Sequence, residues 1–172
     1  MSELQTLHGA ITATIKAAMP QFETVEAYAT ADQNTALPAL IHAVTGLKPG
    51  ADPGDGRACV LATFEACILV DASHPQAALQ AAMLATRLTV LLRQQFWQMD
   101  FVEAVKSVQA LPVQPTTAST HPIIWRVQWE QALYLGAAQW SWPDEPGPLA
   151  FAFSPDTGPG HEAGYQSPED MQ

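Results

Sequence analysis

Histidine is the side chain most often used for acid–base chemistry near neutral pH and for metal binding. The five histidines of this sequence are His8, His42, His74, His121 and His161. No two of them stand at a spacing that would place both on one metal ion. His161-Glu162 has the start of a zinc-protease motif, but the second histidine of that motif is absent. We therefore expect no metal site and no histidine-based catalytic centre.

Other residues that could take part in catalysis or cofactor binding also lack the surrounding sequence that these functions require. Residues 158–163 formally match a dinucleotide-binding fingerprint, but they follow no strand and carry Pro159 where the backbone should turn tightly. Glu65 and Glu130 are candidates for a glycosidase-like carboxylate pair, although solvated sheet faces produce the same pattern. No serine occupies a Gly-x-Ser-x-Gly elbow. The sequence therefore predicts no enzymatic activity and no cofactor.

The strongest turn signal of the chain lies at residues 48–56, which are rich in proline and glycine. Asp52 and Asp55 flank Pro53-Gly54 in this stretch and are candidates for contact with a cation. They lack the alternating oxygen ligands of a calcium loop, so ordinary turn chemistry is the better interpretation. The segment predicts a long loop that joins two strands of a hairpin.

Hydrophobic periodicity predicts the elements that hold these residues. A first helix is expected over residues 4–19, ended by Pro20, and a second over 76–95, with Pro75 in its first turn. The apolar stripe of the second helix comprises Ala77, Ala81, Leu84, Leu88, Leu91 and Gln95, widened by Leu79, Met83 and Val90. Strands are expected over residues 24–28, 39–45, 57–71, 103–111 and 123–135.

This order of elements predicts an α+β fold. We expect a mostly antiparallel sheet of four to five strands, two helices packed on one face, a long hairpin loop and an extended C-terminal tail. Residues 1–136 form the expected core domain, and residues 137–172 form a Pro/Gly-rich acidic arm or disordered tail. Cys59 and Cys67 lie eight residues apart in one predicted strand, which places them beyond disulfide reach.

Composition narrows the class of protein. A chain of 172 residues with 48% apolar residues suits one domain with a core. Seven Lys+Arg against seventeen Asp+Glu give a net charge of −10, which argues against binding the outside of a nucleic-acid duplex. The N-terminus lacks the features of a signal peptide, and no apolar run approaches the roughly 20 residues that cross a bilayer. We expect a cytoplasmic protein at synthesis, without a membrane partner.

The tail cannot build a core of its own, because it combines many prolines and glycines with six acidic residues and no Lys or Arg. Trp140 and Trp142 lie at its start, and tryptophan is enriched in protein interfaces. The alternative is that these tryptophans, like Trp97, cap the edge of the domain's own core. The candidate subunit-interface residues are Pro49, Asp52, Asp55, Arg57, Trp97, Trp140 and Trp142.

Segments spread along most of the chain resemble the tail terminator proteins of long-tailed, Mu-like bacteriophages. They are FETVEAY (22–28), LPALI (37–41), PGADPGDGR (49–57), FEACILV (64–70), WRVQWEQ (125–131) and SPDTG (154–158), followed by His161 and Tyr165. None of these segments is a catalytic signature, and the resemblance brings no catalytic residue with it.

The resemblance implies a structural virion protein that forms a ring, usually of six subunits, at the tail end near the neck. The ring would stop tail-tube growth and contact the tail tube protein and a neck or head-completion protein, with DNA only passing through its lumen. A negative subunit would suit that passage. The alternatives are another phage ring, such as a head–tail connector or tube protein, and a small ligand-binding module of the host.

Overall fold

The computed structural model describes residues 2–32, 34–113, 122–139, 150–153, 155, 157–158 and 160–168. The chain divides into two compact units, Met1–Gln139 and Trp140–Gln172, called here the core unit and the C-terminal unit. The boundary falls close to position 136, where the sequence changes character from a patterned domain to an acidic, proline-rich segment.

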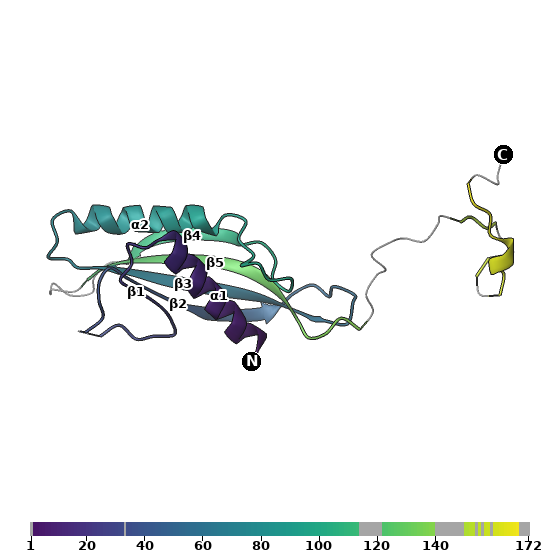
Figure 1. The fold of residues 1–172 in the computed structure, drawn as a ribbon, viewed down its shortest axis with the longest axis horizontal. Coiled ribbons are helices and arrows are strands. Elements are labelled where there is room, and N and C mark those ends of the chain that lie inside the picture. Colours follow the sequence, from purple (N-terminus) through teal and green to yellow (C-terminus); the bar gives the residue numbers. More distant parts are fainter. Residues whose placement is uncertain are drawn as a thin grey trace. The chain divides into compact units, whose positions relative to one another are not determined.

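The described residues of the core unit form two helices and five strands in the order that the sequence predicts (Figure 1). They are α1 (Glu3–Ala18), β1 (Thr24–Ala27), β2 (Ala39–Pro49), β3 (Ala58–Val70), α2 (Ala77–Leu92), β4 (Lys106–Val113) and β5 (Ile123–Leu135). The fold is α+β, as expected. Neither helix, each of 16 residues, has the length and hydropathy needed to cross a membrane.

The five strands form one sheet in the order β1-β2-β3-β5-β4. The pairing of β3 with β5 is antiparallel and uninterrupted from Ala58↔Leu135 to Val70↔Ile123. The β2–β3 and β4–β5 pairs are also antiparallel, whereas β1 runs parallel to β2. The sheet is therefore mostly antiparallel, with one parallel edge strand.

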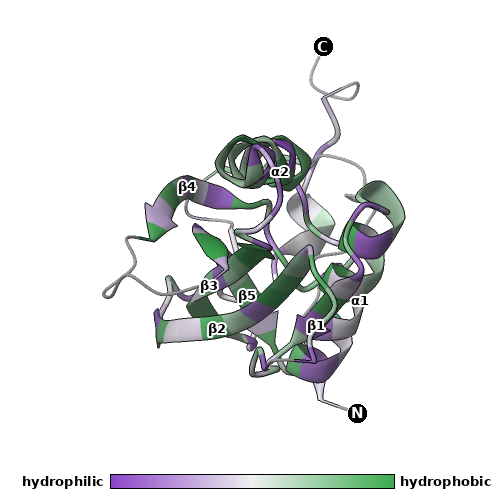
Figure 2. Cartoon of the chain, turned by 90° about the vertical axis from the view of Figure 1, so that its left-hand side faces the viewer, coloured by the Kyte–Doolittle hydropathy of each residue, from purple (hydrophilic) through white to green (hydrophobic). Residues whose placement is uncertain are grey.

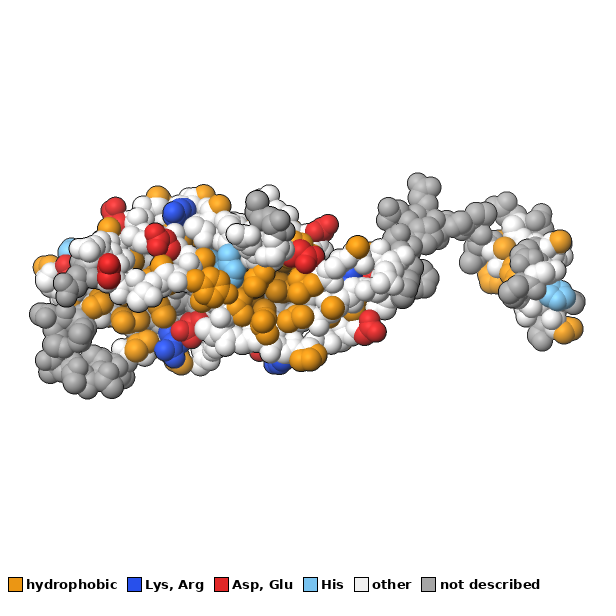
Figure 3. Space-filling model, turned by 90° about the horizontal axis from the view of Figure 1, so that it is seen from below, with side chains coloured by type: hydrophobic (Ala, Val, Ile, Leu, Met, Phe, Trp, Pro, Cys, Tyr) orange, Lys and Arg blue, Asp and Glu red, His pale blue; other side chains and the backbone are white. Residues whose placement is uncertain are grey.

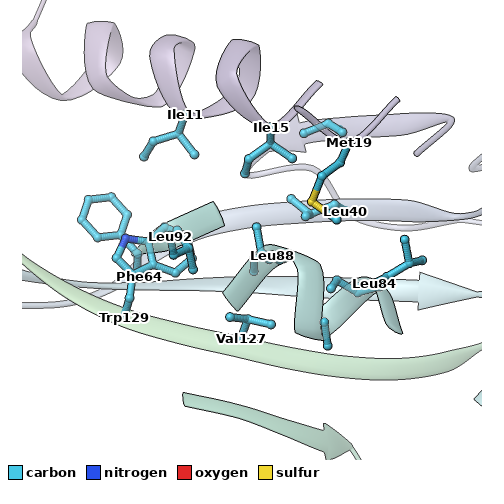
Figure 4. Packing of buried hydrophobic residues seen from close by; sticks show 14 of the residues in the cluster. Ile11, Ile15, Met19, Leu40, Phe64, Leu84, Leu88, Leu92, Val127 and Trp129 are labelled. Carbon is cyan, nitrogen blue, oxygen red and sulfur yellow. The ribbon is translucent and has the colours of Figure 1, made fainter. Parts of the chain in front are cut away.

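Both helices cover the same face of the sheet, as Figure 2 shows. The alternating residues Ala62, Phe64, Ala66 and Ile68 of β3 are fully buried on this face, because successive side chains of a strand point to opposite sides. Figure 4 shows how side chains from both helices and three strands meet there. The labelled members are Ile11, Ile15 and Met19 near α1, Leu40, Phe64, Val127 and Trp129 of the sheet, and Leu84, Leu88 and Leu92 of α2.

The start of α2 differs from the expectation. Pro75 lies in the turn before the helix rather than in its first turn, and Gln76 precedes the helix in a left-handed conformation with φ of 66°. Asp71 stabilises that turn, since its Oδ1 accepts the Ser73 N–H at 2.8 Å. The sequence located the turn correctly but placed the first helical residue too early.

The expected stripe on α2 is also wrong at its C-terminal end and in its width. Ala77, Ala81, Leu84 and Leu88 are buried as predicted, but Leu91 is only half-buried. The other buried positions of the helix are Ala85 and Leu92. Leu79, Met83 and Val90 do not widen this stripe, because they are 56%, 58% and 63% exposed.

Two strands differ from the expected limits by more than one residue at an end. β2 continues to Pro49, which shortens the loop of the hairpin to residues 50–57. β4 begins at Lys106 rather than at residue 103, and its register with β5 shifts between Lys106 and Gln109. Ser107 has a positive φ of 55° within that shift, which a regular strand does not accommodate.

Candidate functional site

Among the described residues, no three His, Cys, Asp or Glu side chains converge in a way that could hold a metal ion. The closest approach of two histidines is internal: Nδ1 of His8 lies 3.4 Å from Nδ1 of His42, and Nε2 of His42 lies 2.8 Å from Oγ1 of Thr12. Both rings are buried. Burial first, and the neighbouring His8 second, lower the pKa of His42 to about 4. The pair is therefore neutral near pH 7 and joins α1 to β2.

The two mid-strand glutamates lie on the sheet face opposite the helices, and each has its own cation. Glu65 Oε1 is 3.1 Å from Nε of Arg126, and Glu130 Oε1 is 3.4 Å from Nζ of Lys48. Each carboxylate therefore contacts a cation of another strand, Arg126 of β5 for Glu65 and Lys48 of β2 for Glu130. The arrangement is that of cross-strand ion pairs.

Both cysteines are free thiols on β3, as their spacing predicts. Burial, together with the neighbouring Glu65 carboxylate, raises the pKa of Cys67, and its thiol donates a hydrogen bond to Glu65 Oε1 at 3.7 Å. A thiol that stays protonated is a poor nucleophile. Cys67 therefore belongs to the packing of the sheet face.

The hairpin loop is held by the turn contacts that its sequence favours. Asp52 Oδ1 accepts the Gly54 N–H at 2.9 Å, and Asp55 Oδ1 accepts the Arg57 N–H at 3.0 Å. The Arg57 guanidinium bonds the Asp55 carboxylate at 2.7 Å and lies 5.1 Å from the ring centroid of Tyr134. The side-chain hydrogen bond from Arg57 lowers the pKa of Asp55. The loop is thus tied down at its base.

Two of the candidate interface positions remain at the surface of this hairpin. Pro49 ends β2 and is exposed, and Asp52 is exposed within the loop. Asp55 and Arg57 are half-buried because they bind each other. The structure therefore brings four of the predicted interface residues together in one loop region.

Trp97 is not a surface residue, which corrects its assignment to the interface. It is 3% exposed, and its indole Nε1 donates to Oε1 of Gln131 at 2.8 Å. The alternative expectation, that it belongs to the domain's own core, describes it correctly. Trp140 and Trp142 lie outside the described residues.

Gln131 is an internal hydrogen-bonding centre that the sequence showed only as a polar break in an apolar strand face. Its Oε1 accepts from the indoles of Trp97 at 2.8 Å and Trp129 at 3.2 Å. Its Nε2 donates to the carbonyl oxygens of Gln95 at 3.1 Å and Glu103 at 2.8 Å. A fully buried amide thereby uses two acceptor and two donor bonds to fix the segment after α2 against β5.

Several large apolar side chains of the core unit stay exposed. Figure 3 shows hydrophobic side chains gathered beside a histidine on the face seen from below. Tyr28 and Leu47 are both exposed, and the Tyr28 hydroxyl accepts the N–H of Val44 at 3.3 Å. β3 pairs with one edge of β2, and β1 pairs with the other edge only over Ala39 to His42. Beyond His42, that second edge of β2 pairs with no strand among the described residues. This strand edge is one candidate surface for assembly.

The C-terminal unit forms local structure without burying the three aromatic residues that the structure describes in it. Phe151 and Gln166 exchange backbone hydrogen bonds of 2.8 and 2.9 Å, and a 3₁₀ turn spans Glu162–Gly164. The Tyr165 hydroxyl accepts the Gly158 N–H at 3.0 Å. Even so, Phe151, Phe153 and Tyr165 remain exposed, with Phe153 at 70%. The described part of this unit therefore presents aromatic surface that it does not cover.

No protein-family model and no curated protein matches this chain. Among solved structures, one chain aligns with 78% of this chain and 94% of its own length, at 13% sequence identity and a TM-score of 0.47. Its name describes no activity. A likeness at this level carries no argument about function.

Proposed function

We propose that this chain is a structural virion subunit that assembles with copies of itself into a ring at the end of a phage tail. In this role the ring stops growth of the tail tube and offers a docking surface to the neck or head. The tail-terminator resemblance of the segments between residues 22 and 165 supplies the location. The exposed surfaces of the described residues support the self-assembly that this role requires.

The observation that carries the proposal is exposed apolar surface on both units. Leu47, Leu79, Met83 and Val90 are exposed on the core unit, and Phe153 on the C-terminal unit. Large exposed apolar side chains that group together usually mark a surface that a partner covers. A ring supplies such a partner, because each subunit presents one surface to a different surface of its neighbour.

Assembly is tested by size-exclusion chromatography with light scattering on the full chain, followed by negative-stain electron microscopy. We expect one closed species whose mass is a small multiple of 18.5 kDa, with six copies as the leading expectation. A monomer at every protein concentration would contradict the proposal.

The place of the ring is tested separately, by cryo-electron microscopy of phage particles that carry the protein. Density for this fold at the junction of tail tube and neck supports a terminator. Density inside the portal region or repeated along the tube would instead assign a connector or a tube protein. Absence from the particle would contradict a virion role even if the purified chain forms rings.

A further inference from the structure

The outer face of α2 carries an apolar stripe opposite the buried one. An α-helix turns by about 100° per residue, so Leu79, Met83 and Val90 fall within one narrow sector. The buried side chains Ala81, Leu88 and their neighbours occupy the opposite sector. Figure 2 shows α2 nearly along its axis, largely in the colour of hydrophobic residues. The helix therefore has a second apolar face, with no described residue covering it.

Two arginines flank this outer stripe. Arg87 and Arg93 lie on either side of it, and α2 contains no Asp or Glu. The chain has seven Lys and Arg, and four of them form ion pairs: Lys48, Arg57, Lys106 and Arg126. Within the described residues, Arg87 and Arg93 have no such carboxylate. In a chain of net charge −10, a positive apolar helix face is an unusual local feature.

A groove runs beside this helix. It is lined by Gln21, by His74 and Pro75 of the preceding turn, and by Leu79, Met83 and Arg87 of α2. Nε2 of Gln21 is a buried donor without a hydrogen-bond partner in the described structure. The groove thus combines the apolar side chains of Leu79 and Met83 with the cation of Arg87, which suits an apolar segment that also carries acidic groups.

The chain itself contains a segment with the complementary chemistry. Residues 140–172 hold five aromatic side chains and six acidic ones, with no Lys or Arg. Phe151, Phe153 and Tyr165 of this segment are exposed. The alternative of two α2 helices packing on each other would bring Arg87 and Arg93 near their own copies without any acid on the helix, which like-charge repulsion disfavours.

We propose that the outer face of α2, together with its groove, receives the acidic aromatic segment 140–172 of a neighbouring copy. This inference rests on the proposed self-assembly and names the surfaces that would carry it. Aromatic side chains lie on Leu79, Met83 and Val90, and acidic side chains approach Arg87 and Arg93. The contact joins two different surfaces, as the closure of a ring requires.

The test uses two full-length variants that disable one side each. R87E/R93E reverses the charge of the helix face, and F151S/F153S removes two exposed aromatics from the segment. Each is expected to raise the dissociation constant for assembly about tenfold or more, measured by light scattering across protein concentrations. L79S/M83S is a second face variant that leaves the charge unchanged and is expected to act in the same direction. K16E/Q5E/Q109E, with the same charge change at exposed positions outside α2, should assemble like the wild type.

Mixing the two disabled variants distinguishes a contact between copies from one within a copy. The face variant keeps an intact segment and the segment variant keeps an intact face, so one contact can form between them. We expect a heterodimer that grows no further. Failure of the mixture to pair would overturn docking between copies.

Two further outcomes separate this inference from the proposed function. If the wild type assembles and R87E/R93E assembles equally well, the α2 face is not the docking surface, and the ring proposal survives. If the wild type stays monomeric at all concentrations, the proposed function fails, and docking between copies fails with it.

Discussion

Residues of β3 and β5 alternate between a face covered by α1 and α2 and a face on which the described core unit places no helix. On the covered face, the Gln131 amide is buried and makes all its hydrogen bonds inside the protein. His8 and His42 are buried against each other on the same face, and His8 Nε2 has no hydrogen-bond partner among the described residues. On the open face, polar groups are satisfied by partly exposed ion pairs, such as Glu65–Arg126. The same two strands thus have one face whose polar groups lie in the core and one face whose ion pairs stay in contact with solvent.

The consequence is that assembly and folding can be tested separately. Changes on the open sheet face and on the outer face of α2 should leave the core unit folded. Changes on the covered face should unfold it before any effect on assembly can be measured.

Truncating Phe64 to Ala is expected to cause the largest loss. Its ring is fully buried and stacks on Trp129 with centroids 5.4 Å apart. Loss of a buried phenylalanine costs about 3–5 kcal/mol, through lost burial and the cavity left behind. Leu61→Ala, on the open face of the same strand, should cost less than about 1.5 kcal/mol because Leu61 is only half-buried. Urea unfolding measures the loss in free energy of unfolding for both variants. Equal losses would show that the two faces contribute equally to stability.

Replacing Gln131 with Leu should be the next most damaging change, at about 3 kcal/mol. The substitution keeps the volume but removes the partner of two indole N–H groups and of the Glu103 carbonyl oxygen. The Gln95 carbonyl oxygen loses one of its two bonds and still accepts the Val105 N–H at 2.9 Å. Gln128→Leu is the matched control on the open face of β5. We expect it to change the free energy of unfolding by less than about 0.5 kcal/mol. A stable Gln131→Leu variant would show that water replaces the lost bonds.

Acid should lower the free energy of unfolding through the buried histidines of the covered face. The pKa of His42 is 6.5 in an unfolded chain and about 4 in the folded one, because burial disfavours its charged form. Between these values the unfolded chain binds more protons, so the free energy of unfolding falls as pH drops from 6.5 to 4, by at most about 3 kcal/mol. Below pH 4 this contribution has been lost. Burial lowers the pKa of His8 in the same direction.

Urea unfolding at several pH values measures this slope. His42→Gln should flatten it between pH 6.5 and 4, because the substitution removes the buried imidazole whose pKa is lowered. The carboxyl groups whose pKa is lowered by hydrogen bonds, such as those of Asp55 and Asp71, act mainly below their ordinary value of 3.8. An unchanged slope in His42→Gln would refute the histidine explanation.

Much of the fold was predictable because strand alternation and helix periodicity survive in the sequence. The limits of β5 were predicted correctly, and β3 differs from the expectation by one residue at each end. The stripe on α2 was not fully predictable, since the helix is apolar on two opposite faces and periodicity cannot tell which of them meets the core. Leu79, Met83 and Val90 were therefore assigned to the wrong side.

The candidate site was predictable only in part. The hairpin loop carries its own turn signals, so Asp52 and Asp55 behave as expected. Trp97 gave no such signal, because a tryptophan at the end of a helix suits either a core or an interface. The partners of Gln131 lie 34 and 36 residues away at Trp97 and Gln95, and contacts over such distances leave no local pattern. Its polar side chain within an apolar strand face was the one sequence signal of a buried hydrogen-bonding residue.

The smallest expected effect concerns the ion pair of the open face. Arg126→Gln removes the partner of Glu65, and the Arg126 side chain is 51% exposed while that of Glu65 is 19% exposed. Ion pairs with this much solvent contact contribute about 1 kcal/mol or less, and salt screens them. A double-mutant cycle with Glu65→Gln, measured in low and high salt, isolates the pair. A coupling as large as the loss in Gln131→Leu would mean that the open face also fixes the fold. A small coupling that disappears in high salt would leave this face available for contacts with other subunits, because substitutions there would alter assembly without unfolding the core unit.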